Sequence, residues 1–171
     1  MKRNFNTNTE DNPEWLTPPE LIKALGSFDL DPCAVIAAKR PWPTAWLHYA
    51  GGAEIDGLVA PWQGRVWLNP PYGRETFKWL DRLAAHGSGI ALIFARTETK
   101  GFHATVWQKA HAVFFFEGRI AFHYVNGTRG DVANAPSCLV AYSAADAAAI
   151  HAAMIGGGCE RAVNLPRARY H

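Results

Sequence analysis

Apolar residues recur along this chain in two spacings, one typical of β-strands and one typical of α-helices. Short apolar or alternating runs that end at breaker residues predict strands. These runs are Phe28–Asp31, Ala45–Tyr49, Arg65–Leu68, Ile90–Phe94, Ala112–Phe116 and Ser137–Tyr142, of which 45–49 has the weakest pattern. The run 90–94 contains no polar residue, which is typical of a strand buried on both faces.

Other segments have helical spacing. Between residues 76 and 86 the apolar residues fall on one face, and Gly87 ends the pattern. Thr17 followed by prolines, with Glu20 three positions later, predicts a capping box that begins a helix over Pro18–Leu25. The remaining predicted helices are Phe102–Ala110 and the alanine-rich Ala144–Met154.

Strands that alternate with helices predict an α/β domain with a mostly parallel sheet. The run that begins at Ala112 continues after Gly118 to Tyr124, and Asn126-Gly127 separates it from the run 137–142. We therefore expect an antiparallel strand pair at one end of the sheet. No repeat or linker divides the chain, so we expect a flexible N-terminus over residues 1–13 and one domain over residues 14–171.

The composition limits the class of protein. Hydrophobic residues make up 49% of the chain and charged residues 19%, which fits a packed domain rather than a disordered one. The net charge of +2 is a weak argument for a nucleic-acid partner. Cys33, Cys138 and Cys159 are far apart and the histidines lack metal spacing, so we expect no disulfide framework and no metal site.

Targeting signals are not evident in the sequence. The N-terminal residues are polar, and no apolar run approaches the roughly 20 residues that a membrane span needs. We therefore expect neither a signal peptide nor a membrane segment. Reduced thiols and a cytoplasmic location are the corresponding expectation.

Unusual polar residues follow two of the predicted strands. Asp31-Pro32-Cys33-Ala34 ends the first, and Asn69-Pro70-Pro71-Tyr72 follows the strand 65–68. Ligands of open α/β sheets bind beyond the carboxyl ends of the strands, so we expect both segments at one edge, beside a ligand site. The alternative is that each is an ordinary turn, because Asp-Pro and Pro-Pro-Tyr-Gly are common turn sequences.

The Asn-Pro-Pro-Tyr segment suits methylation of an aromatic amino group. The exocyclic nitrogen of adenine is a poor nucleophile because its lone pair is delocalised into the ring. The side-chain carbonyl of Asn69 and the backbone carbonyl of Pro70 can accept hydrogen bonds from its two N–H groups, and successive prolines hold these carbonyls rigidly. Tyr72 can stack on the base, which is worth about 1–3 kcal/mol and helps offset the cost of extruding a base from a duplex.

Several segments resemble one known family in the same order. They are Trp15-x-Thr17-Pro18, Phe28-Asp29-Leu30-Asp31-Pro32-Cys33-Ala34, Asp56-Gly57-Leu58, Trp67-Leu68-Asn69-Pro70-Pro71-Tyr72 and Gly118-Arg119-Ile120-x-Phe122. From about Trp15 to Tyr142 the chain resembles the small phage-type DNA N-6-adenine methyltransferases, the Dam-like enzymes of phages and prophages. The resemblance implies a single-domain class I methyltransferase fold, Rossmann-like, with S-adenosylmethionine as methyl donor and DNA as partner. For a phage-encoded enzyme the bacterial host cytoplasm is the implied location.

The resemblance also implies roles for individual residues. The implied catalytic residues are Asn69, Pro70, Pro71 and Tyr72. The implied cofactor-binding residues are Trp15, Thr17, Pro18, Asp31, Pro32, Cys33 and Asp56. Tyr72, Arg74 and Arg119 are candidate substrate-binding residues. The chain departs from the family pattern in two places: no Gly-x-Gly follows the first strand, and Glu54 is only a weak candidate for the acidic residue that grips the ribose.

These residues also have structural alternatives. Asp56-Gly57 also predicts a hairpin turn, Trp15 a core residue, Arg119 a surface charge, and Cys33 a small buried side chain. Basic residues after the Asn-Pro-Pro-Tyr segment can neutralise DNA phosphates or form a solvated face; they are Arg74, Lys78, Arg82, Arg96 and Lys100. Base readout would fall to loops such as Asn126–Ala135, or to a partner subunit.

The function itself also has alternatives. Corners of this kind serve enzymes that methylate amino groups of RNA bases or of glutamine side chains. A non-catalytic DNA-binding module of the same fold is a further possibility, although the intact Asn69-Pro70-Pro71-Tyr72 segment argues against it.

Overall fold

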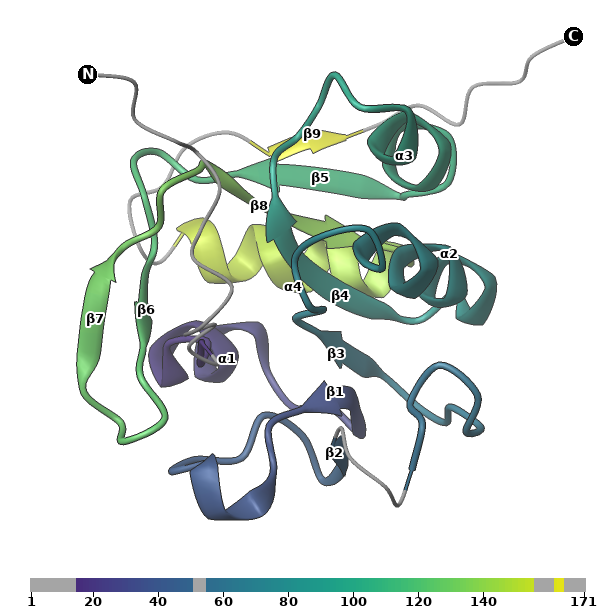
Figure 1. Cartoon of the computed structure of the whole chain (residues 1–171). Coiled ribbons are helices and arrows are strands. Elements are labelled where there is room, and N and C mark those ends of the chain that lie inside the picture. The colour runs from purple at the N-terminus through teal and green to yellow at the C-terminus, as the bar shows by residue number, and fades with distance from the viewer. Residues whose placement is uncertain (1–14, 51–54, 156–161, 165–171) are drawn as a thin grey trace, which may run out of the picture.

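The computed structural model describes residues 15–50, 55–155 and 162–164 (Figure 1). The main sheet consists of β1 (Leu30–Ala34), β2 (Leu47–Ala50), β3 (Val66–Leu68), β4 (Gly89–Phe94), β5 (Ala112–Phe115), β8 (Ser137–Ala141) and β9 (Ala162–Asn164). Its seven strands have the order β2-β1-β3-β4-β8-β5-β9. Parallel pairing joins β2, β1, β3 and β4, whereas β8 is antiparallel to β4 and β5, and β9 to β5. Strands β1 to β5 therefore all run in one direction.

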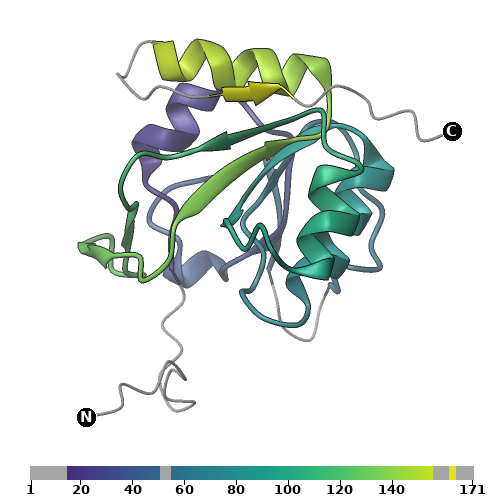
Figure 2. The same ribbon diagram turned by 90° about the horizontal axis from the view of Figure 1, so that it is seen from above.

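Helices cover both faces of this sheet (Figure 2). One face packs against α1 (Pro19–Leu25) and α4 (Ala144–Ile155). The other packs against α2 (Thr76–His86), α3 (Lys100–Phe102) and the π-helical turn η2 (His103–Trp107). A 3-10 turn, η1 (Ala37–Lys39), follows β1. Side chains of one strand alternate between the two cores: Val66 and Leu68 pack on the α2 side, and Trp67 on the α1 side. Covered faces explain why β3 and residues 90–94 of β4 are apolar at every position.

The predicted mixed α/β sheet is confirmed. The helix over residues 76–86 has the predicted bounds, and Gly87 ends it in the left-handed conformation with φ 79°. Residues 90–93 are fully buried in β4. The antiparallel pair predicted from the runs at 112 and 137 is present as β5 with β8.

Two elements begin or end differently from the prediction. Helix α1 begins at Pro19 with Pro18 as its N-cap and has no side-chain capping bond, so the predicted capping box at Thr17 is wrong; Thr17 is buried instead. The first strand does not stop before Pro32 but continues to Ala34. Pro32 lies where the pairing with β2 shifts register, between Asp31 and Ala34, and a residue without an N–H is tolerated at such an irregularity.

The segments 102–110 and 126–135 also differ from the prediction. The predicted helix over 102–110 is a short α-helix followed by the π-helical turn. The predicted loop 126–135 contains a strand, β7 (Arg129–Val132), which forms a hairpin with β6 (Ala121–His123). The Asn126-Gly127 turn closes this hairpin, with Gly127 at φ 83°. Asn126-Gly127 is therefore a turn, as predicted, but it joins β6 to β7 and not the runs that begin at 112 and 137.

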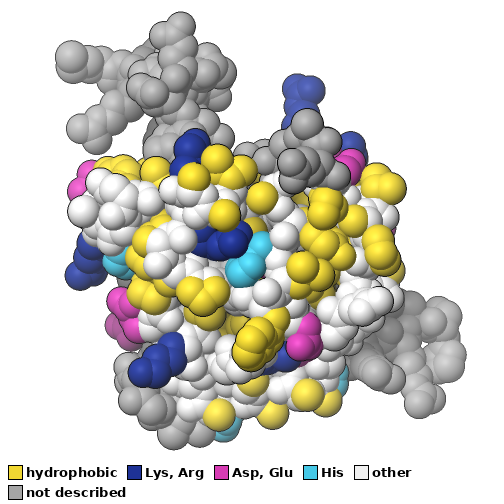
Figure 3. Space-filling view, turned by 90° about the horizontal axis from the view of Figure 1, so that it is seen from below, with side chains coloured by type: hydrophobic (Ala, Val, Ile, Leu, Met, Phe, Trp, Pro, Cys, Tyr) yellow, Lys and Arg dark blue, Asp and Glu magenta, His cyan; other side chains and the backbone are white. Residues whose placement is uncertain are grey.

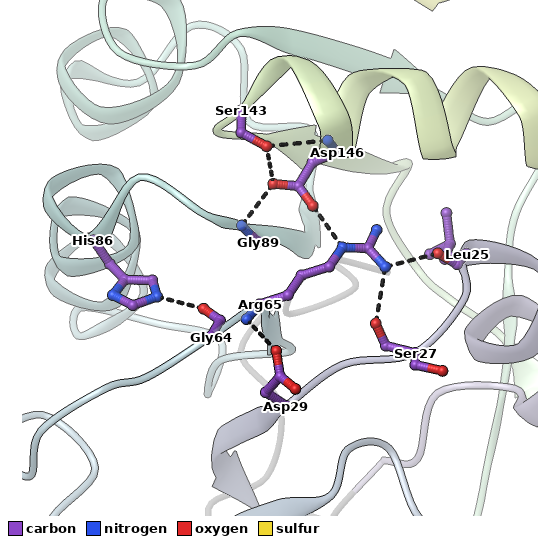
Figure 4. A network of polar contacts seen from close by, with 9 residues as sticks. All are labelled: Leu25, Ser27, Asp29, Gly64, Arg65, His86, Gly89, Ser143 and Asp146. Carbon is purple, nitrogen blue, oxygen red and sulfur yellow. Dashed lines mark hydrogen bonds and ion pairs between the residues drawn. The ribbon is translucent and has the colours of Figure 1, made fainter.

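Arg65 and Asp146 form a polar clamp at the amino ends of β3 and β4 (Figure 4). Arg65 Nε donates to Asp146 Oδ1 at 2.7 Å, and Asp146 Oδ2 accepts from the Gly89 N–H at 2.7 Å. Arg65 Nη1 also donates to the carbonyls of Leu25 and Ser27, each at 3.0 Å. The clamp ties α4 and the end of α1 to the sheet, at the edge opposite to the carboxyl ends of the strands.

Some sequence-based expectations lie outside the described residues, namely the flexible N-terminus over residues 1–13, Glu54 and Cys159. Among the described residues, no helix is long and apolar enough to cross a membrane. Within the same ranges, no cluster of His, Cys, Asp and Glu has the arrangement of a metal site.

Candidate active site

The two polar strand ends lie together, as predicted. Because β1 and β3 are neighbouring parallel strands, their carboxyl ends fall at the same edge of the sheet. The thiol of Cys33 donates a hydrogen bond to the backbone carbonyl of Asn69, with Sγ 3.2 Å from the oxygen. Burial and the Asp31 carboxylate both raise the pKa of this thiol, so Cys33 remains a protonated donor rather than a nucleophile.

A cavity of about 570 Å³ opens at this edge, within the roughly 300–1,000 Å³ that small-molecule sites usually have. Its walls come from the end of β1, the loop that precedes β2, the N-terminal segment, the turn at 55–57 and the corner after β3. The lining residues are Trp15–Thr17, Asp31–Ile36, Arg40, Trp42, Thr44, Ile55–Gly57, Trp67, Asn69–Tyr72 and Trp79. The cavity therefore joins segments that are far apart in the sequence.

The Asn69–Tyr72 corner has a defined internal geometry. Pro70 is buried, and the hydroxyl of Tyr72 donates to Asn69 Oδ1 at 3.2 Å. The Tyr72 ring stacks on Phe94 from the end of β4, with ring centroids 4.0 Å apart and planes 13° apart. Burial raises the pKa of the Tyr72 hydroxyl, so this group stays protonated and can act as a donor.

The first residue of α2, Thr76, fixes the corner from behind. Its hydroxyl donates to the Pro71 carbonyl at 2.7 Å and accepts from the Gly73 N–H at 3.0 Å. These two hydrogen bonds connect the corner after β3 directly to the start of α2, and they restrict the movement of Asn69. Sequence reasoning missed this role, although a Thr at a helix start five residues after Pro71 was a usable signal.

Asp31 is a buried carboxylate in the wall of the cavity, 5% exposed. Its Oδ2 accepts from the Thr44 hydroxyl at 2.5 Å, and its Oδ1 accepts from the Cys33 N–H at 3.2 Å. Burial raises the pKa of Asp31 to about 6, because desolvation of the charged form outweighs these hydrogen bonds and the nearby Arg40. A buried carboxylate with few partners is suited to receive a cationic group.

His48 holds the loop that brings Thr44 to Asp31. Its Nε2 lies 3.2 Å from the backbone nitrogens of both Thr44 and Ala45, so it accepts two hydrogen bonds and the ring must be unprotonated there. Burial and Arg40 lower the pKa of His48 to about 4, which keeps the ring neutral at physiological pH. Neither His48 nor Thr44 was predicted, because the weak pattern of residues 35–65 hides their approach to β1.

The N-terminal segment covers the α1 side of the cavity. Thr17 is buried and its carbonyl accepts from the Trp42 indole N–H at 3.2 Å. Trp15 packs against Tyr124 of the β6–β7 hairpin, with ring centroids 4.9 Å apart. Both predicted residues line the cavity, and the hairpin supports Trp15 from outside.

The turn at Asp56-Gly57 forms another wall. Asp56 Oδ1 accepts from the Leu58 N–H at 2.8 Å, and the Asp56 carbonyl accepts from Val59 and Ala60, so this is a single turn and the hairpin alternative is wrong. A Cβ at position 57 would overlap the backbone carbonyl of Pro32. Only glycine therefore lets this turn, and Asp56 with it, approach the end of β1.

Three of the predicted site residues do not line the cavity. Pro18 is buried as the N-cap of α1. Arg74 is exposed, and Arg119 is exposed and donates to the Ala133 carbonyl at 3.2 Å. Arg119 thus contributes to the base of the hairpin and lies outside the cavity lining.

Two of the basic residues that follow the corner have partners within the protein. Lys78 pairs with Glu75 at 2.8 Å, and Arg82 lies over the ring of Trp62 at 4.8 Å. On the face shown in Figure 3, basic and acidic side chains are scattered among apolar ones. The long-range field of this face is therefore a weak source of affinity for a polyanion.

Comparison with known proteins identifies a family. The model of the family described as DNA N-6-adenine-methyltransferase (Dam) matches residues 4–149. No curated protein and no solved structure matches the chain. The matched range includes the whole cavity lining, from Trp15 to Trp79, and ends within α4. The chain accordingly belongs to the DNA N-6-adenine-methyltransferase (Dam) family.

Proposed function

We propose that this protein transfers a methyl group from S-adenosylmethionine to the exocyclic N6 amino group of adenine in DNA. One observation carries the proposal: the Asn69–Tyr72 corner and the Asp31 carboxylate line the same cavity. The methyl donor and the amino group that accepts the methyl can then lie in the same cavity. The order of the main sheet, with the antiparallel β8 between β4 and β5, supports a class I methyltransferase arrangement.

The groups in the cavity wall fit the proposed donor. S-adenosylmethionine supplies a methyl group on a positively charged sulfur and carries a cationic amino group and a carboxylate at its amino-acid end. Asp31 is the buried anion that can receive the cationic end. Trp67, which is fully buried and also lines the cavity, has an indole N–H with no partner in the described structure. A buried donor without a partner is costly, and an acceptor atom of a ligand would satisfy it.

The corner fits an aromatic amino group. An amide oxygen has two acceptor positions, and Tyr72 occupies one of those on Asn69 Oδ1. The described residues provide no donor for the Pro70 carbonyl. These two oxygens can hold the two N–H bonds of the acceptor nitrogen and direct its lone pair toward the donor. The contribution of the protein is then positioning in a site that excludes water, and no covalent intermediate with the chain is required.

The experiment compares substrates and a single substitution. Wild-type protein is incubated with labelled S-adenosylmethionine and, separately, with DNA, RNA and protein, and the modified base is identified by mass spectrometry. We expect label in N6-methyladenine of DNA, and Asn69→Ala should lower the rate by at least about 100-fold, the scale for loss of one positioned polar group. Gln108→Ala, which removes an exposed amide side chain away from the cavity, is the matched control and should retain activity.

Each alternative function has its own outcome in this assay. Label in RNA or in protein glutamine would identify a different substrate. Absence of label, together with no donor binding in a separate calorimetric titration, would favour a non-catalytic module. If Asn69→Ala turned over as fast as wild type, the proposed role of Asn69 in holding the amino group would be wrong for any substrate.

A further inference from the structure

We infer that Phe94 is a positioning residue for capture of the target base, acting through Tyr72. The inference rests on the proposed function and extends it to a residue outside the Asn-Pro-Pro-Tyr corner. Phe94 is the last residue of β4, two strands away from β1, and no feature of the sequence pattern marked it.

The first step of the argument is where Phe94 lies. Tyr72 lines the cavity and Phe94 does not, although their rings are stacked with centroids 4.0 Å apart. Phe94 therefore covers one face of Tyr72 from outside the cavity lining. The opposite face of Tyr72 is the one that remains for a ligand, so a flat base would form the third layer of a stack.

The second step is what the stack fixes. A nearly parallel pair of rings, 13° apart, restricts rotation of Tyr72 about its side-chain bonds. The Tyr72 hydroxyl in turn donates to Asn69 Oδ1, the oxygen that the proposed reaction uses. Phe94 thus controls two properties at once, namely the plane on which the base stacks and the direction of the catalytic carbonyl.

The third step is what holds Phe94. Its backbone carbonyl accepts from the Arg96 N–H at 2.8 Å, and its strand pairs with β8 up to Ser137. The next residue, Ala95, donates to the Pro136 carbonyl at 2.9 Å. The ring is therefore carried by a rigid strand end rather than by a mobile loop, which is what precise positioning requires.

A matched pair of substitutions tests the inference. Phe94→Leu keeps an apolar side chain but removes the stack, and Phe94→Tyr restores it. Phe115→Leu is the control, because Phe115 also ends a strand beside β8, is also half-buried, and has Trp107 rather than Tyr72 as its aromatic neighbour. The measurements are KM for DNA, kcat, affinity for S-adenosylhomocysteine, and fluorescence of 2-aminopurine placed at the target position.

The expected result is specific to base capture. Phe94→Leu should raise KM for DNA about 5- to 10-fold, a loss of the size that one aromatic pair contributes, and should weaken the 2-aminopurine signal. Affinity for S-adenosylhomocysteine should stay within about twofold of wild type, Phe94→Tyr should restore KM, and Phe115→Leu should lower stability without raising KM.

The opposite results are distinguishable from failure of the proposed function. An active wild type with an unchanged KM in Phe94→Leu would overturn this inference alone. Equal losses of DNA capture and of S-adenosylhomocysteine affinity would reduce Phe94 to a core residue and would also overturn it. A wild type that methylates no DNA would overturn the proposed function, and the inference with it.

Discussion

The buried carboxylate of Asp31 predicts that donor binding depends on pH. The Asp31 pKa lies near 6 in the ligand-free protein, and only the ionised form attracts the cationic end of the donor. The apparent affinity scales with the ionised fraction, so binding at pH 5 should be about 10-fold weaker than at pH 8. His48, with a pKa of about 4, stays neutral over this range and does not contribute.

The assay is calorimetry with S-adenosylhomocysteine, which keeps the cationic amino group, at intervals between pH 5 and pH 8. Asp31→Asn is the matched variant, because it has nearly the same shape and can still accept from the Thr44 hydroxyl. We expect weak and pH-independent binding by this variant, and a midpoint near pH 6 for wild type. A flat wild-type profile between pH 5 and pH 8 would refute the assignment of Asp31 to the cationic group.

Asp31→Asn should weaken donor binding but raise the free energy of unfolding. The Asp31 pKa is raised from 3.8 to about 6 on folding, so between these pH values the folded state binds more protons than the unfolded state. The contribution of Asp31 to stability therefore falls as pH rises through this window. A shift of this size costs at most about 3 kcal/mol at pH 8, and Asp31→Asn should recover about 1–3 kcal/mol of it. Urea denaturation at pH 8 checks this; a destabilised Asp31→Asn would contradict it.

Two further substitutions test the framework of the site. Gly57→Ala places a Cβ against the Pro32 carbonyl, so it should lower the free energy of unfolding by about 1–3 kcal/mol and weaken donor binding. An unchanged donor affinity in calorimetry would show that the turn at 55–57 is not a wall of the donor site. Asp146→Asn removes the charge that pairs with Arg65, whose side chain is 22% exposed. We expect the free energy of unfolding to fall by about 2–3 kcal/mol, less than for a fully buried pair. The melting temperature should then fall by roughly 4–12 °C. Asp81→Asn, which removes an exposed ion pair with Lys109, is the control and should cost less than about 1 kcal/mol. Equal shifts in the two variants would mean that the clamp contributes little.

The sequence by itself determined the elements whose signals are local. The helix over 76–86 follows from apolar spacing and a glycine stop, and β4 from a run without polar residues. The meeting of Asp31 with Asn69 was also predictable, because neighbouring parallel strands end at one edge and each strand is followed by polar residues. The composition of the Asn69–Tyr72 corner also predicted the proposed methylation of an amino group.

Only the tertiary structure decided which residues surround that chemistry. Thr44 and Phe94 reach the site through contacts with residues distant in the sequence, and such contacts leave no periodic pattern. His48 and Thr76 act through short-range hydrogen bonds that apolar spacing does not reveal either. Arg119 shows the converse, since a residue that matches the family pattern donates to the Ala133 carbonyl at the base of the hairpin, outside the cavity lining. Its role in substrate binding stays a prediction. Local patterns specify secondary structure because they depend on near neighbours, whereas a site depends on which distant segments the packed core brings together.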